Sequence, residues 1–215
     1  MSTTPSSRPA PPGPGRSATG RRPRPADERI LAAAFRLFYA RGIRAVGVDL
    51  VIAEAEVAKA TFYKHYPAKD DLVLAYLDRV DGLWTRELRR AAAVAGPTAA
   101  DRLVGLFDAL VTTGARAGYR GCAFLNVAAE AVPGGRVHRR AVEHKLAVLG
   151  WVQSLAGDAG APDPAGLART LTLLLDGALA AGTMDADPRA ARLAADTARA
   201  VVSAAVPAPG LSQPG

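Results

Sequence analysis

The sequence predicts an all-α protein: a three-helix head followed by a mostly antiparallel bundle of about six helices. Three observations carry this prediction. Apolar residues recur at helical spacing from Asp27 onward, whereas the alternation typical of strands is poor. Ala, Leu and Arg, all strong helix formers, dominate the composition. Gly and Pro clusters interrupt the helical pattern and divide the chain into segments.

The first part of the chain predicts three short helices and one long one. Gly42 ends the first helix, and Pro67 ends the third because the residue before a proline resists helical angles. Asp70 and Asp71 fall in the first turn of the long helix, where carboxylates favour the helix dipole. We expect these helices at 27–41, 47–55, 58–65 and 69–93.

The second part of the chain predicts five further helices. Pro133-Gly134-Gly135 and the run from Gly157 to Pro164 separate neighbouring segments. We expect these helices at 98–117, 121–131, 136–157, 164–182 and 187–205. The domains that follow are a head at 27–77 and a bundle at 78–206.

The two ends of the chain lack helical periodicity. Residues 1–26 are rich in proline and contain five arginines and no acid, so they hold +5 of the formal net charge of +7. We expect a disordered leader there and a flexible tail at 207–215. Two interpretations of the leader stay open: a solubilising segment, or an arm that contacts an anionic polymer.

Several classes of function find no support in the sequence. The sequence contains no G-x-S-x-G, P-loop or H-E-x-x-H motif, and His138 and His144 lie six apart, off the spacing of a helical metal site. We expect no enzyme, no metal and no cofactor. No apolar run is long enough to span a bilayer, and the single cysteine, Cys122, cannot form an internal disulfide. We therefore expect a cytoplasmic protein without membrane contact.

The predicted third helix has two contrasting faces. At about 100° per residue, Ala58, Phe62 and Tyr66 fall on one side of it. The opposite side carries Ala60, Tyr63 and Lys64, flanked by Lys59 and Thr61. A short helix of this kind, preceded by another across a tight turn, is typical of a helix that enters the DNA major groove. On these residues alone, an ordinary solvated surface helix remains the alternative.

The motif at this helix resembles the DNA-binding region of the TetR family of bacterial transcriptional regulators. The chain reads F-Y-A-R-G at 38–42 and V-I-A-E-A-E-V-A-K-A-T-F-Y-K-H-Y-P-A-K-D-D-L at 51–72. The family pattern has a helix ending F-x-x-x-G, then I-A-x-x-A-G-V-S-x-x-T-L-Y-x-H-F-x-x-K-x-x-L. The resemblance covers residues 27–77 and implies a helix-turn-helix head. The matching positions are Thr61, Tyr63, His65, Lys69 and Leu72.

The resemblance implies which residues contact double-stranded DNA. Base readers are Lys59, Ala60 and Lys64, and phosphate contacts are Thr61, Tyr63, His65 and Lys69. Glu56 departs from the pattern because it stands at the usual turn glycine, and Ala58 replaces a serine that would cap the third helix. Val46-Gly47 replaces the threonine expected to open the second helix.

For the bundle, the resemblance implies a homodimer that binds a small-molecule effector; it is weaker here, confined to G-C-A-F-L-N-V-A-A-E at 121–130 and the helical layout. Aromatic walls with a few polar tips suit a ligand site. The candidates are Trp84, Phe107, Tyr119, Phe124, Asn126, Glu130 and Trp151. The candidates for the dimer interface are Leu171, Leu174, Leu175, Ala178, Leu179, Gly182, Ala194, Ala198 and Val201. For both sets, ordinary internal core remains the alternative.

The interpretation as a whole is a homodimeric regulator, a repressor released from a palindromic operator by a small ligand. The competing hypothesis is a helical scaffold protein of the same fold that has lost DNA binding through Glu56 and Ala58.

Overall fold

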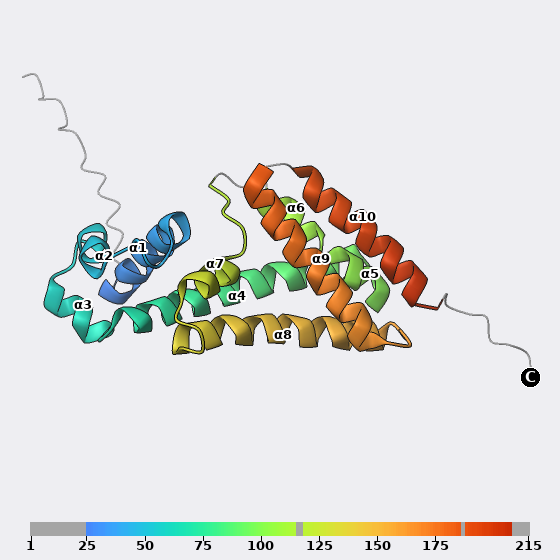
Figure 1. Cartoon of the computed structure of the whole chain (residues 1–215), viewed down its shortest axis with the longest axis horizontal. Coiled ribbons are helices and arrows are strands. Elements are labelled where there is room, and N and C mark those ends of the chain that lie inside the picture. The colour runs from blue at the N-terminus through green and yellow to red at the C-terminus, as the bar shows by residue number, and fades with distance from the viewer. Residues whose placement is uncertain (1–24, 115–117, 186–187, 208–215) are drawn as a thin grey trace, which may run out of the picture.

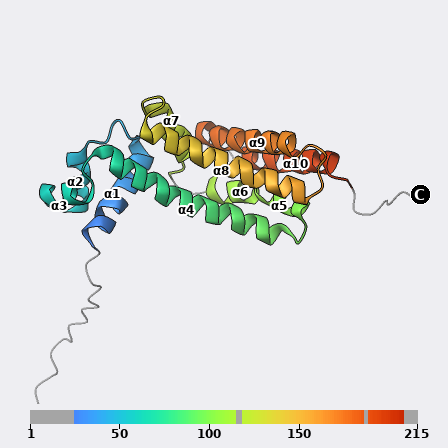
Figure 2. The same ribbon diagram turned by 90° about the horizontal axis from the view of Figure 1, so that it is seen from below.

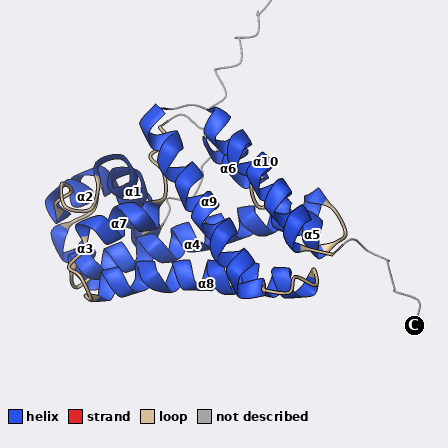
Figure 3. Ribbon diagram, turned by 45° about the vertical axis from the view of Figure 1, so that its right-hand side comes forward, coloured by secondary structure: helices blue, strands red, loops and turns tan. Residues whose placement is uncertain are grey.

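The structure, a computed structural model, describes residues 25–114, 118–185 and 188–207. Regular secondary structure in these residues is entirely helical (Figure 3), so the all-α prediction is confirmed. No helix in this described part is long and apolar enough to cross a membrane. The predicted leader up to residue 24 and the predicted tail from residue 208 lie outside the described residues.

The helices follow one another with short connections. In the described residues they are α1 (Ala26–Arg41), α2 (Val48–Ala55), α3 (Lys59–His65), α4 (Lys69–Ala95), α5 (Ala99–Gly105), α6 (Asp108–Gly114), α7 (Ala123–Glu130), α8 (Arg136–Asp158), α9 (Pro164–Asp185) and α10 (Pro188–Ala205). Most expected bounds agree within three residues.

The expectation of a single helix at 98–117 is wrong, because the segment divides into α5 and α6. Leu106 and Phe107 lie between the two helices, and both are buried in the bundle core. Neighbouring residues of a regular helix point about 100° apart. A tighter turn, with the Phe107 N–H donating to the Val104 carbonyl at 3.1 Å, brings both side chains inward. The sequence spacing alone gave no sign of this turn.

The helices form an elongated molecule with the head at one end (Figure 1). Helices α1 to α3 lie together there, and α4 leaves them to run along α8 through the length of the bundle. Figure 2 shows α9 and α10 running together at the edge of the bundle opposite α4. With 27 residues, α4 is about 40 Å long at 1.5 Å per residue and joins the two ends of the molecule.

Two hydrophobic clusters form the core. One contains residues of the three helices α1, α2 and α3, of the first half of α4, of α7 and of the start of α8. The other lies among the rest of α4 and α8 and the helices α5, α6, α9 and α10. The rings of Phe35 and Phe38 meet Tyr76 edge-on, with ring centroids 5.7 and 5.6 Å apart. The head is therefore packed against α7 as well as α4, so it contacts the bundle directly.

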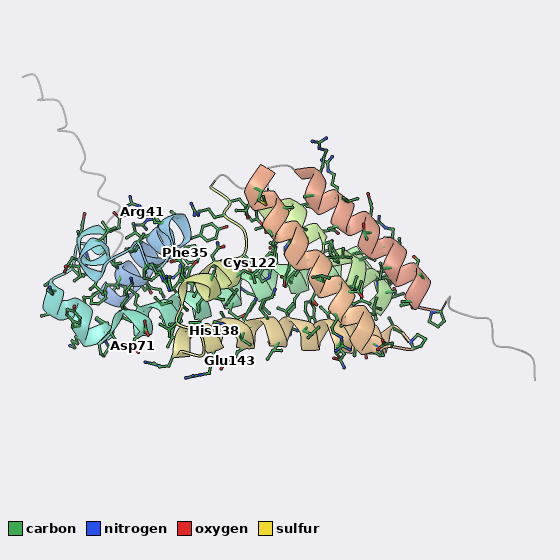
Figure 4. The ribbon with its side chains drawn as sticks, in the orientation of Figure 1. Phe35, Arg41, Asp71, Cys122, His138 and Glu143 are labelled. Atoms are coloured by element: carbon green, nitrogen blue, oxygen red, sulfur yellow. The ribbon has the colours of Figure 1, made fainter. Side chains whose placement is uncertain are left out.

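A row of ion pairs fastens α4 to α8. Asp71 lies 3.1 Å from Arg136, and Arg140 reaches both Asp78 at 2.7 Å and Asp81 at 2.6 Å. The row ends inside the molecule at His144, whose Nδ1 lies 2.7 Å from the Asp81 carboxylate. Figure 4 marks Asp71 at the head end of this row. The pairs set the register of the two helices.

His144 is 2% exposed and is the most deeply buried polar side chain among the described residues. Its ring stacks on Phe124, with centroids 3.6 Å apart. Burial lowers the pKa of His144, and this outweighs the opposite influence of the Asp81 carboxylate. Burial also acts to raise the pKa of Asp81, but hydrogen bonds from Arg140 and His144 prevail and lower it. The neutral imidazole therefore donates its Nδ1–H to the Asp81 carboxylate.

The lowered pKa of His144 predicts that acid weakens the fold. A histidine with a folded pKa below its unfolded value, about 6.5, binds more protons when unfolded. Its contribution to the free energy of unfolding is complete above that pH and is lost as pH falls below it. We expect the urea midpoint of the wild type to fall between about pH 7 and pH 5, and to fall less in His144→Phe.

The matched control is His138→Phe, on the same helix but outside the Asp81 contact; it should keep the wild-type decline. If His144→Phe and the wild type lose stability with equal slopes, the buried imidazole is not the cause.

Candidate functional site

A left-handed turn at Glu56 sets the angle between α2 and α3. Glu56 has φ 53° and ψ 49°, and it is the one non-glycine residue with positive φ in the described part of the chain. The Val57 N–H donates to the Ile52 carbonyl at 3.3 Å, closing the end of α2. Arg29 donates from Nη1 to the Glu56 carbonyl at 3.2 Å, which ties the turn to α1. The position therefore has the geometry that favours glycine, as the sequence pattern indicated.

The predicted two-faced character of α3 is confirmed at Phe62 and Tyr66, whereas Ala58, expected on the same side, precedes the helix and is exposed. Phe62 is fully buried and Tyr66 is half-buried, on the side that packs against the head. Tyr63 is 43% exposed, and Lys64 and His65 also face solvent. The Phe62 and Tyr63 rings meet edge-on at 5.3 Å, so the buried ring supports the exposed one. The helix thus presents a cationic, hydroxyl-bearing flank at the end of the molecule.

The seven residues expected to contact DNA lie on α3 and the first turn of α4. Lys59, Ala60, Tyr63, Lys64 and His65 are exposed, and Thr61 and Lys69 are half-buried. Lys59 forms an exposed ion pair with Asp49 at 3.3 Å. Such pairs contribute little free energy, so this one does not prevent the ammonium group from meeting a phosphate.

Three helix starts in the head lack a side-chain cap. Pro25 precedes α1, Gly47 precedes α2 and Ala58 precedes α3, and none of them has a side-chain group that accepts a hydrogen bond from the helix. At α4 the Asp71 carboxylate accepts from the Ala68 N–H at 3.0 Å. This bond opens α4 beside Lys69. The Asp71 N–H donates to the Ala68 carbonyl at 3.2 Å, so the amide groups left for a phosphate are those of Lys69 and Asp70.

A cavity of about 380 Å³ lies where the head meets the bundle. It falls in the size range of small-molecule sites. Its walls are mainly apolar and aromatic, and they come from six parts of the fold: α1, the middle of α4, the end of α6, residues 118–122, the start of α7, and α9.

Three of the seven expected ligand residues line this cavity: Trp84, Tyr119 and Phe124. The other four do not. Phe107 is fully buried in the bundle core, and Trp151 lies under the Arg89 guanidinium, 5.0 Å from its ring centroid. Phe107 and Trp151 thus take part in ordinary packing, which was the alternative to a ligand site.

Asn126 and Glu130, expected as a pair on one face of a helix, serve the contact between α7 and the chain around it. Asn126 donates from Nδ2 to the Arg120 carbonyl at 2.8 Å. The Arg44 N–H donates to a Glu130 carboxylate oxygen at 2.7 Å, and Arg44 Nε donates to the Glu130 carbonyl at 2.6 Å. These bonds fasten the loop after α1 to the end of α7, so both side chains are occupied away from the cavity.

Among the aromatic residues of the cavity wall, the sequence analysis missed two: Phe35 and Tyr39 of α1. They belong to the segment expected only to bind DNA, so they were not considered for a ligand site. Both lie off the apolar stripe of Ile30, Ala34 and Leu37, and an aromatic pair four residues apart beside that stripe was the available signal.

The two tyrosine hydroxyl groups in the cavity wall are bonded to backbone, whereas the buried Thr113 Oγ1 of the same wall has no hydrogen-bond partner. Tyr119 donates to the Leu179 carbonyl at 3.0 Å, and burial raises its pKa. The Tyr39 hydroxyl accepts from the Arg120 N–H at 2.9 Å and donates to the Gly121 carbonyl at 3.2 Å. Burial also raises the pKa of the neighbouring Cys122 thiol. The cavity wall is thus largely neutral.

Five residues expected at a dimer interface lie in the protomer's own core: Leu171, Leu175, Leu179, Ala194 and Ala198. Leu174, Ala178, Gly182 and Val201 are half-buried. The exposed face of α9 and α10 instead carries Leu173, which is 74% exposed, and Leu193, which is 69% exposed. The sequence gave both helices apolar residues around most of their circumference, so spacing alone did not identify the outer face.

Comparison with known proteins gives a consistent picture. The family profile described as "Bacterial regulatory proteins, tetR family" matches residues 30–76. A TetR-family transcriptional regulator from Streptomyces coelicolor is 37% identical, with 84% of this chain and 95% of that one covered and a TM-score of 0.78. No match was found among curated proteins.

Two further solved structures share the architecture. One, described as a TetR transcriptional regulator from Streptomyces avermitilis, is 28% identical over 85% of this chain and 98% of that one, with a TM-score of 0.76. The regulatory protein TetR from Rhodobacter sphaeroides is 23% identical over 82% and 98%, with a TM-score of 0.71, and shares the fold.

The strained turn predicts a stabilising substitution. A left-handed conformation costs a non-glycine residue about 1 kcal/mol. We expect Glu56→Gly to raise the melting temperature by roughly 2–4 °C for a chain of this size. The Arg29 bond remains, because it goes to the carbonyl group. Differential scanning calorimetry checks this.

Glu56→Ala is the matched control: it removes the carboxylate but keeps the Cβ atom, so it should gain little. Equal melting temperatures for the glycine and alanine variants would contradict strain as the cause.

Proposed function

We propose a function from one premise: this chain belongs to the TetR family of bacterial transcriptional regulators. It is a DNA-binding regulator by that membership, and we propose that it is a cytoplasmic repressor released from a palindromic operator by a small molecule. In this proposal residues 27–77 bind DNA, and residues 78–206 bind the ligand and form a homodimer. The exposed cationic flank of α3, fixed by the buried Phe62 ring, is the observation that carries it.

The side chains of α3 suit the two kinds of contact that DNA offers. Lys59 and Lys64 are exposed at the ends of one face and reach guanine acceptors in the major groove, and the Ala60 methyl fits against a thymine methyl. Tyr63, His65 and Thr61 carry donors suited to phosphate oxygens. Lys69 adds its charge at the start of α4, where free amide groups also attract a phosphate.

A homodimer would bring two copies of α3 to successive turns of the same duplex. We place the interface on the exposed face of α9 and α10, around Leu173 and Leu193. At Gly177, on this face of α9, an added Cβ would meet no atom within 4 Å. That open surface lets the backbone of a second copy approach closely, and exposed leucines supply the apolar area to bury.

We place the effector in the cavity, where Trp84, Tyr119 and Phe124 form part of the wall. The cavity borders α4, which reaches from the head into the bundle. A ligand that binds better when the two heads are mis-spaced for the operator weakens DNA binding by linkage. A differential affinity of a few kcal/mol between the two states is enough to change operator occupancy greatly.

Charge reversal on α3 tests DNA recognition. We expect Lys59→Glu combined with Lys64→Glu to abolish the electrophoretic shift of the DNA that flanks the protein's own gene, because two attractive charges become repulsive. The matched control is Arg86→Glu with Arg102→Glu, which makes the same change of net charge at exposed bundle positions. An unaltered shift in the Lys59 and Lys64 variant would favour the scaffold alternative.

A second test concerns the dimer. We expect Leu173→Glu combined with Leu193→Glu to give monomers in sedimentation and to weaken operator binding at least tenfold, because buried unpaired carboxylates are costly. Val94→Glu is the control: Val94 is 76% exposed near the far end of α4. A double variant that stays dimeric would place the interface elsewhere.

A further inference from the structure

The DNA-binding head supplies one wall of the cavity. Phe35 and Tyr39, four residues apart on α1, both line it. Figure 4 shows Phe35 on α1 and Cys122 before α7 close to one another at the junction of head and bundle. Since α1 packs against both α2 and α3, a molecule in the cavity would touch the same body that carries the cationic flank.

The cavity wall selects by charge. Five of its residues carry aromatic rings, and no lysine, arginine or histidine occurs among the described lining residues. Its one charged residue is Glu87, whose carboxylate is already bonded to Arg90 at 2.7 and 3.3 Å. An anion would find no cationic side chain among the described lining residues to pair with, and a cation would have to compete with Arg90 for Glu87. An uncharged aromatic molecule fits this wall best.

Among the described residues, Tyr39 forms one of two hydrogen-bonded links that join α1 and the loop after it to the segment before α8. Its hydroxyl joins the Arg120 N–H and the Gly121 carbonyl, at 2.9 and 3.2 Å, and Cys122 of the cavity wall follows directly. The other link, between Arg44 and Glu130, lies outside the cavity. Of the two links, an occupant of the cavity therefore contacts only the one at Tyr39.

We propose that the cavity takes an uncharged aromatic molecule and that Tyr39 is the positioning residue through which it acts on the head. An occupant seated against Phe35 and Tyr39 parts the Tyr39 hydroxyl from the Arg120 and Gly121 backbone, and α1 then moves with α2 and α3. The inference rests on the proposed function in one respect, that ligand binding weakens DNA binding. It adds the chemical class of the ligand, and it adds α1 to α4 as an element through which ligand binding moves the head.

The single cysteine of the chain offers a test without a known ligand. Cys122 lines the cavity, so a group attached there acts as an occupant. The Cys122 thiolate attacks the sulfenyl sulfur of a methanethiosulfonate, forms a mixed disulfide and releases methanesulfinate. Because burial raises the pKa of this thiol, the reaction is run in mildly alkaline buffer. The probes are the benzyl, methyl and 2-sulfonatoethyl reagents, with Cys122→Ser as the unreactive control.

Reaction rates test the ligand class. Each rate is divided by the rate of the same reagent on the urea-unfolded protein, which removes differences in intrinsic reactivity. We expect this normalised rate to be at least ten times higher for the benzyl reagent than for the anionic sulfonatoethyl reagent. Equal normalised rates for the two reagents would overturn the preference for an uncharged molecule.

DNA affinity tests the role of Tyr39. We expect the benzyl adduct to weaken DNA binding about tenfold or more, and the methyl adduct to do so much less. In Tyr39→Phe the effect of the benzyl adduct should shrink at least threefold. Tyr119→Phe is the matched control, because its hydroxyl also bonds a backbone carbonyl in the cavity wall but within the bundle, and it should keep the full effect. An equal effect in both variants would overturn the role of Tyr39.

Hydrogen exchange of the Arg120 amide measures, without DNA, whether the bond between this amide and the Tyr39 hydroxyl is broken. The benzyl adduct should speed this exchange in the wild type and in Tyr119→Phe, since the amide then loses its bond to Tyr39. No change in its exchange would overturn the inference. If the unmodified protein bound no DNA, the proposed function would fail, and the exchange measurement would still decide the role of Tyr39.

Discussion

The continuity of α4 is the constraint on which the rest of the structure depends. Its first two turns bury Leu72, Tyr76 and Leu77 in the head, and its last turns bury Leu88 and Ala92 in the bundle. Because the two ends of α4 are buried in two different cores, the head can rotate relative to the bundle only if α4 bends or slides along α8. Sliding is resisted by the ion pairs between α4 and α8, so the relative placement of head and bundle has few alternatives.

The ion pairs along α8 differ in how strongly they resist sliding of α4. Arg136 is 60% exposed, so its pair with Asp71 contributes little. Arg140 is less exposed, and it holds Asp81 together with the buried His144. The ring of His144 in turn stacks on Phe124, which lines the cavity. A continuous path of contacts therefore runs from the cavity through His144 and Asp81 to α4, beside the shorter path through Tyr39 to α1. The cavity lies where both paths to the head begin.

Local patterns in the sequence predicted what local physics decides. Helix bounds and the two faces of α3 follow from spacing, breakers and backbone sterics within a few residues, whereas the turn at Glu56 was indicated by the resemblance to the family pattern, which has glycine there. The turn between α5 and α6 escaped because it arises from packing Leu106 and Phe107 together. The cavity wall was predicted in part, with Trp84, Tyr119 and Phe124 found and Phe35 and Tyr39 missed, because it forms between segments far apart in the chain. Likewise, which side of α9 faces outward depends on neighbours that a periodic pattern does not contain.

The head shows that tertiary packing outweighs local preference at the surface that we propose for DNA binding. Helix α3 has seven residues, too few to be stable alone, and it lacks a cap at Ala58. The missing cap and the strained Glu56 each cost about 1 kcal/mol. Burial of the Phe62 side chain contributes about 2–3 kcal/mol, and the α1 and α4 residues around it add further apolar contact. The packing term therefore balances or exceeds both local costs. The cationic flank keeps its orientation because the Phe62 ring beneath it is held by the head core, so the residues on the outer side of α3 can vary without loss of this packing.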